Sequence, residues 1–287
     1  MVKKVRYYSD SIFYSWQNMA VKLSPPDYQA LLQSAETKMI TVKLAQKYHW
    51  DYDTSEVFDG KIYITLLPFD SNKNHPEKFA FYLGVDIGAA AWECDVYFFN
   101  RDLLIAKHHV NHRYGLEMNH YQDEEGKTVI YYRENFQSGS GIWWFDYYFY
   151  RYEGNTLVPV LKELQNGNLS MFTANRTRWL EAKVTKTRPL TLKMIYYLTG
   201  ENGEDIIRDS TLVQYLKDAK SNMLKGNYAK SKLTEEQILA YNLGRYDDLF
   251  FIRAHYDILK RLVNGKDKAK RKLVLYFLNE AKADLND

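Results

Sequence analysis

The sequence contains little of what marks a specialised class of protein. It has one cysteine, Cys94, which excludes an intramolecular disulfide and a zinc site built from several cysteines. Its 39 basic and 36 acidic residues leave a net charge of only +3, whereas nucleic-acid-binding domains usually carry a strongly basic face. No apolar run approaches the length of a membrane span. We therefore expect neither nucleic acid as a partner nor a membrane span.

Signals for targeting and for cofactors are equally scarce. The basic residues in 1–7 are not followed by an apolar segment, so they do not form a signal peptide. We expect a cytoplasmic protein or, if a leader has been removed, an envelope or secreted one. The glycine-rich run 138–141 lacks the Gly-Lys-Ser/Thr that cradles phosphate, and the Gly-x-Ser-x-Gly of α/β-hydrolases is absent. We predict no cofactor and assign no catalytic residue.

Aromatic side chains are abundant, with 25 Tyr, 14 Phe and 6 Trp, and they concentrate in residues 142–152. Alternate residues of a strand point to opposite faces. One face of this strand is apolar and suits a core: Trp143, Phe145, Tyr147 and Phe149. The other adds hydroxyls and a carboxylate: Trp144, Asp146, Tyr148 and Tyr150. We predict that this second set binds a ligand, because Tyr and Trp offer both stacking and a hydrogen bond. The alternative is that it packs beneath the terminal helices.

A period of two in the hydrophobic pattern runs from about residue 60 to 200, as in Leu190–Tyr197. Turn residues such as Asp59-Gly60 and Glu153-Gly154-Asn155 separate the alternating segments. Short strands joined in this way predict an antiparallel sheet, a sandwich or a partly open barrel. Residues 205–230 fit either a helix or a hairpin of strands 211–217 and 222–229, and we favour the hairpin.

Helical spacing flanks the strands on both sides. Ser24-Pro25-Pro26-Asp27 begins a helix predicted over 26–46. Thr234 and Gln237 form a capping box, which starts the first of three predicted helices over 234–243, 246–263 and 268–284. The predicted fold class is α+β. We expect a β-rich domain with an N-terminal helix over 1–230 and a helical region over 231–287 packed on it, or one domain that contains both.

Four of the seven histidines lie close together in the sequence, between residues 108 and 120. If 103–112 is a strand, His108 and His112 share one face, and His120 returns on the next strand. These three are the candidate ligands for zinc or copper. No carboxylate at a diagnostic spacing supports them, so we predict that this hairpin binds no structural metal.

Three classes of function remain open, one of which is a metal-dependent function at the histidine hairpin. The sequence favours a non-catalytic binding or interaction protein with an aromatic sheet face, whose candidate partners are carbohydrate or protein. The alternative is a hydrolase, for instance of glycans, with acids placed by the fold. Glu93, Asp95 and Asp146 are the acids inside aromatic strands, and we expect each to point outward or to pair with an arginine. Two carboxyl groups about 5–10 Å apart in a cleft would favour hydrolysis.

Overall fold

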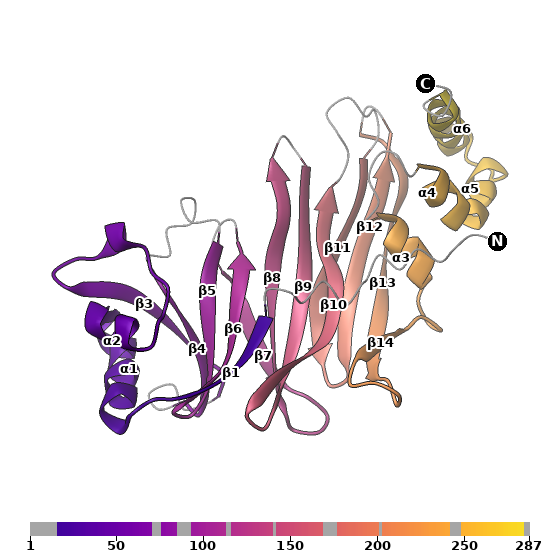
Figure 1. The fold of residues 1–287 in the computed structure, drawn as a ribbon. Helices are drawn as coiled ribbons and strands as arrows, with labels where there is room; N and C mark the ends of the chain where they lie inside the picture. Colours follow the sequence, from indigo (N-terminus) through magenta and orange to yellow (C-terminus); the bar gives the residue numbers. More distant parts are fainter. Residues whose placement is uncertain are drawn as a thin grey trace. The chain divides into compact units, whose positions relative to one another are not determined.

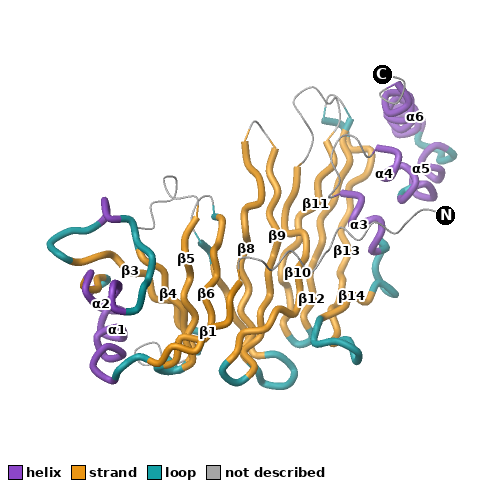
Figure 2. The backbone as a smooth tube through the Cα atoms, in the orientation of Figure 1, coloured by secondary structure: helices purple, strands orange, loops and turns teal. Residues whose placement is uncertain are grey.

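The computed structural model describes residues 16–70, 76–84, 93–112, 116–139, 142–168, 177–200, 203–241 and 248–283. Within these ranges the chain forms fourteen strands and six α-helices (Figures 1 and 2). The predicted α+β class, with antiparallel sheets, an N-terminal helix and a helical C-terminal region, is confirmed. None of the helices in the described ranges is long and apolar enough to cross a membrane.

Two compact units divide the chain. Unit 1 contains Met1–Glu134 and Tyr148–Val160, and unit 2 contains Asn135–Tyr147 and Leu161–Asp287. The first sheet, in unit 1, has the strand order β1-β6-β5-β4-β3-β2, and every neighbouring pair is antiparallel. Its strands are β1 (Trp16–Lys22), β2 (Met39–Thr41), β3 (Lys61–Pro68), β4 (Lys78–Leu83), β5 (Glu93–Asn100) and β6 (Leu103–Asn111).

Two helices, α1 (Pro25–Thr37) and α2 (Val42–Lys47), cover one face of this sheet. They bury apolar side chains such as Leu31 and Leu44 against an aromatic layer on the strands. In that layer Phe79 and Phe99 stack with their ring centroids 5.0 Å apart. Such stacking adds to the stabilisation from buried area.

The helix predicted over 26–46 is wrong in its middle. The chain leaves α1 at Lys38, which adopts a left-handed conformation with φ 58°. Residues Met39–Thr41 then pair with β3 as β2, and the Thr41 side chain accepts a hydrogen bond from the Leu44 amide to cap α2. Ile40 and Thr41 are β-branched and favour a strand. Pairing with β3 therefore prevails over the helical spacing.

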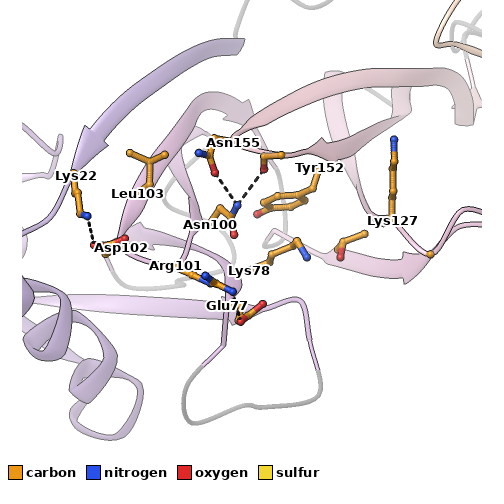
Figure 3. Close-up of a pocket in the computed structure, with 13 residues that line it drawn as sticks. Lys22, Glu77, Lys78, Asn100, Arg101, Asp102, Leu103, Lys127, Tyr152 and Asn155 are labelled. Atoms are coloured by element: carbon orange, nitrogen blue, oxygen red, sulfur yellow. Dashed lines mark hydrogen bonds and ion pairs between the residues drawn. The ribbon is translucent and has the colours of Figure 1, made fainter.

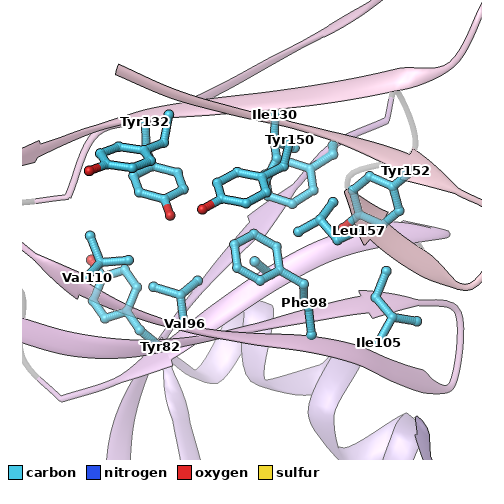
Figure 4. Close-up of a cluster of buried hydrophobic side chains, with 14 of the residues drawn as sticks. Tyr82, Val96, Phe98, Ile105, Val110, Ile130, Tyr132, Tyr150, Tyr152 and Leu157 are labelled. Carbon is cyan, nitrogen blue, oxygen red and sulfur yellow. The ribbon is translucent and has the colours of Figure 1, made fainter. Parts of the chain in front are cut away.

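The other face of the first sheet packs on strands β7 (Met118–Gln122), β8 (Thr128–Gly139), β9 (Ile142–Glu153) and β10 (Thr156–Asn168). These belong to a second sheet with the order β14-β13-β12-β11-β10-β9-β8-β7. In Figure 4 the rings of Tyr132 and Tyr150 face Val96 and Phe98 of the first sheet. Unit 1 is thus a sandwich of two sheets with helices on its outer face.

Unit 2 combines the strands β11 (Thr177–Thr187), β12 (Leu190–Thr199), β13 (Asp205–Lys217) and β14 (Leu224–Asn227) with four helices. The predicted hairpin in 205–230 is confirmed, because β13 pairs antiparallel with β14. The even-numbered side chains of β12, such as Leu192 and Met194, are buried. The helices are α3 (Glu235–Tyr241), α4 (Asp248–Ala254), α5 (Tyr256–Val263) and α6 (Lys268–Ala283).

The capping box is confirmed at α3. The Gln237 amide donates to the Thr234 hydroxyl at 3.2 Å, and the Thr234 amide donates to the Gln237 side chain at 2.9 Å. The helix predicted over 246–263 is interrupted at His255, which separates α4 from α5. There the imidazole Nδ1 lies 3.0 Å from the carbonyl oxygen of Phe251. The backbone bonds from the His255 amide to Phe251 and from the Leu259 amide to His255 are kept across this break, both at 2.9 Å.

Candidate functional site: a polar cleft in unit 1

The predicted ligand-binding residues of β9 lie in different surroundings. Asp146, in unit 2, is buried and forms an ion pair with Lys162 at 2.8 Å. Tyr148 and Tyr150, in unit 1, are buried in the sandwich core. The side chain of Trp144 lies outside the described residues. Strand β9 therefore does not bring these residues together as one exposed surface in the described part of the chain.

The two tyrosines pack as core side chains. Their rings each stack on Tyr132, with centroid distances of 6.0 Å for Tyr148 and 5.9 Å for Tyr150. Burial raises the pKa of the Tyr150 hydroxyl. The layer that covers them is the first sheet of unit 1, where the sequence-based alternative had expected the terminal helices. A binding role for this set of residues stays a prediction.

The three candidate metal ligands are also separated. His108 is buried between Phe98 and Tyr150, with centroid distances of 4.4 Å to each ring. His112 is buried just after β6. His120 is on β7, and its ring lies beside that of Phe69. Among the residues that the structure describes, no three His, Cys, Asp or Glu side chains are grouped as a metal would need.

A charged cluster lies on the helix-covered face of the first sheet, beyond the apolar core. It consists of Asp51, Glu93, Asp95, Lys107 and His109. The Lys107 ammonium joins Asp51 at 2.7 Å and Asp95 at 2.5 Å. The His109 imidazole contacts Asp95 through Nδ1 at 2.9 Å and Glu93 through Nε2 at 3.2 Å. The sequence had suggested that these acids point outward or pair with arginine. Glu93 is exposed, and the partners of Glu93 and Asp95 are lysine and histidine.

The charges of this cluster satisfy one another. The hydrogen bond to Asp95, with help from Glu93, raises the pKa of His109. Both of its ring nitrogens are engaged, so neither is available as a general base. A hydrogen bond with Asp95, and then one with Lys107, lowers the pKa of Asp51. We read the cluster as a clamp that holds the loop after α2 on β5 and β6.

The cleft of unit 1 has a volume of about 780 Å³ and opens where the hairpin ends of its two sheets meet (Figure 3). Such a volume lies in the range of small-molecule sites. Four hairpin ends and the end of β1 supply its lining, which comprises Lys22, Glu77, Lys78, Asn100, Arg101, Asp102, Leu103, Gly126, Lys127, Thr128, Tyr152, Gly154 and Asn155.

Polar groups of the cleft are held in place by the framework. The Asn100 side-chain amide donates to the carbonyl of Gly154 at 3.1 Å and to Asn155 Oδ1 at 3.0 Å. These bonds join the β5–β6 turn to the β9–β10 turn. The Tyr152 ring is buried, and its hydroxyl donates to the Phe99 carbonyl at 3.3 Å. A ligand would therefore meet a fixed aromatic ring and preset amide groups.

Cations outnumber carboxylates in the lining. Four cationic side chains line the cleft, Lys22, Lys78, Arg101 and Lys127, against the two carboxylates Glu77 and Asp102. The two carboxylates are neutralised, because Glu77 pairs with Arg101 at 2.9 Å and Asp102 pairs with Lys22 at 3.4 Å. The cleft is thus suited to hold a polar ligand, and its own acids are engaged as ion-pair partners.

Sequence reasoning identified several of these residues only as turns. Glu153-Gly154-Asn155 carries the signature of a hairpin turn, and Gly154 has the positive φ of 59° that such a turn requires. That this turn meets the β5–β6 turn depends on how the two sheets stack. Strand periodicity carries no signal for that arrangement.

Comparisons with known proteins give no information on function, so the function is inferred from the geometry of the cleft. No protein-family model, curated protein or solved structure matches the chain.

Proposed function

We propose that the protein is a non-catalytic binding protein whose ligand, a polar molecule of the size of a sugar, occupies the cleft of unit 1. The observation that carries this proposal is a cleft of about 780 Å³ whose polar groups are fixed by the framework. Functional loops on a rigid β-scaffold are a common arrangement for binding sites.

The aromatic sheet face inferred from the sequence reaches this cleft at one residue. Tyr152 lies on the same face of β9 as Tyr148 and Tyr150, because alternate residues of a strand share a face. It is the member of that series that lines the cleft. With 3% of its surface exposed, Tyr152 backs the wall of the cleft, and the polar groups around it would bind the hydroxyls of a sugar.

The ion pairs formed by the acidic side chains favour binding over hydrolysis. A glycoside hydrolase needs one carboxylic acid that donates a proton and one carboxylate that attacks or activates water. In the cleft, Glu77 and Asp102 are each held by a cation. In the charged cluster, Lys107 lies between Asp51 and Asp95. Each of these acids is engaged by a cation, which favours a binding role.

A titration with defined sugars tests the proposal. Glucose, galactose, glucose 6-phosphate and galacturonate are titrated into the protein by calorimetry and by NMR. The variant Asn155→Trp places a bulky ring at the rim of the cleft, and Lys43→Trp on the exposed side of α2 is its matched control. We expect at least one sugar to bind, Asn155→Trp to weaken it roughly tenfold or more, and Lys43→Trp to leave it unchanged.

Two outcomes would contradict the proposal. The cleft is not the site if no sugar binds, or if Asn155→Trp binds as the wild-type protein does. The hydrolase alternative gains support if oligosaccharides release new reducing ends and Asp95→Asn abolishes that release.

A further inference from the structure

The cations that line the cleft differ in whether a carboxylate accompanies them. Lys22 pairs with Asp102 and Arg101 pairs with Glu77. Lys127 pairs with Glu153 at 2.5 Å. In the described ranges of the chain, the Lys78 ammonium has no carboxylate within 4 Å, and it lies over the Tyr152 ring, 5.9 Å from Nζ to the ring centroid. Lys78 is therefore the cation of the cleft lining that has no ion-pair partner among the described residues.

The position of Lys78 is set by its backbone. It is the first residue of β4, its amide donates to Asp70 Oδ2 at 3.1 Å, and its carbonyl accepts from the Phe69 amide at 2.8 Å. Figure 3 shows its side chain beside the Tyr152 ring within the cleft. The side chain is half-buried there. A fixed backbone and a buried ring on one side restrict where the ammonium can go, which reduces the entropy cost of binding.

We propose that the ligand of the cleft is anionic and that Lys78 binds its carboxylate or phosphate group. This inference rests on the proposed function, since it names the class of ligand for the same cleft. Charge complementarity supports it: cationic side chains outnumber carboxylates in the lining, and the anion would pair with the cation that lacks a carboxylate partner. Charge-assisted hydrogen bonds that an ammonium donates to an anion are stronger than neutral ones.

The residues around Lys78 suggest that the ligand has two parts, an anionic group and a hydroxylated part. Lys78 binds the anionic group, whereas the Asn100 and Asn155 side-chain amides suit a hydroxylated remainder. A sugar acid or a sugar phosphate has both parts. The two classes carry different anionic groups, so each acidic probe is compared with its own neutral sugar.

The first test measures anion binding by itself. Inorganic phosphate, acetate and chloride are titrated at matched ionic strength while NMR follows the backbone amide of Lys78 and its side chain. We expect saturable shifts with phosphate or acetate, none with chloride, and their loss in Lys78→Gln. Lys78→Arg keeps the charge and should retain binding, and Lys43→Gln is the control for a lysine outside the cleft. Equal shifts with all three anions, or unchanged shifts in Lys78→Gln, overturn the inference.

The second test compares each acidic sugar with its neutral partner. We expect galacturonate to bind more tightly than galactose, or glucose 6-phosphate more tightly than glucose, by roughly tenfold. Lys78→Gln should remove that difference without changing the melting temperature. If acidic and neutral sugars bind equally and Asn155→Trp weakens both, the anion inference fails while the cleft stands as a binding site. If no sugar responds to Asn155→Trp, the proposed function itself fails.

Discussion

Neighbouring residues of one strand can meet opposite electrostatic conditions, as His108 and His109 on β6 do. The His108 imidazole is buried between aromatic rings, and loss of hydration lowers its pKa to about 3. The His109 imidazole points to the other face, where its bond to Asp95 raises its pKa. The alternation of a strand thus produces one histidine that stays neutral and one that favours a charge.

The pKa of His108 predicts a loss of stability in acid. Above its ordinary pKa of about 6.5, His108 is neutral in both states and its contribution is constant. Below that value the unfolded chain binds a proton that the folded protein does not accept until about pH 3. The free energy of unfolding should therefore fall as the pH falls between these values, by up to about 1.4 kcal/mol per pH unit.

Urea unfolding of the wild-type protein and of His108→Phe over this pH range measures the effect. His255 in unit 2 is also buried, and burial lowers its pKa to about 4, so it adds acid sensitivity to both proteins. The difference between the two proteins isolates His108. Equal pH slopes in the two proteins would show that His108 is protonated in the folded state as readily as in the unfolded one.

Local sequence patterns predict a helix or strand correctly where no neighbouring strand competes for the backbone hydrogen bonds of the segment. The α3 capping box formed as its four-residue pattern indicates, because Thr234 and Gln237 satisfy each other's backbone amides without help from the rest of the fold. The segment 26–46 has equally good helical spacing, yet its middle became β2. There a neighbouring strand, β3, offered backbone hydrogen bonds to Met39–Thr41.

Removal of the cap should destabilise the C-terminal helices. In Thr234→Ala the Gln237 amide loses its side-chain acceptor, so we expect the free energy of unfolding to fall by about 1 kcal/mol. Thr234→Ser keeps the hydroxyl and should stay close to the wild-type value. Chemical unfolding monitored by circular dichroism compares the three proteins. A loss of equal size in both variants would mean that the Thr234 methyl group, and not its hydroxyl, supplies the stabilisation.

Across the whole molecule, aromatic residues mainly fill interiors. Both cores of unit 1 are rich in them: Phe79, Phe81 and Phe99 lie beneath the helices, and Phe98 and Tyr150 lie between the sheets. Sheets stacked face to face leave a gap that large flat side chains fill well. The many tyrosines of the sequence therefore mainly fill the core. Tyr152 belongs to this buried set and also lines the cleft.

A pair of phenylalanine variants separates the two environments. Phe98 is fully buried between the sheets of unit 1, whereas 73% of Phe58 is exposed. We expect Phe98→Ala to reduce the free energy of unfolding by about 3–5 kcal/mol, and Phe58→Ala to change it by less than about 0.5 kcal/mol. Guanidinium unfolding at neutral pH gives both values. A small effect at Phe98 would indicate that the sandwich core collapses easily around the lost ring.

Periodicity by itself determined the class of the fold. The switch from a period of two to a period of 3.6 depends on which face of each element is apolar, and that information lies within each segment. The tight turn at Asp59-Gly60, where both residues have positive φ, follows from local chemistry in the same way. The sequence left 205–230 open between a helix and a hairpin, and pairing of β13 with β14 decided it.

Only the tertiary structure decided which faces are covered and which turns meet. The face of β9 with Tyr148 and Tyr150 looks amphipathic in sequence, and it is buried because the first sheet stacks on it. The cleft joins Asn100 to Gly154 and Asn155, residues more than fifty positions apart. Side-chain alternation shows which residues share a face of a strand, but it does not show which element covers that face. The stacking of two sheets depends on the shape and burial of all the side chains between them.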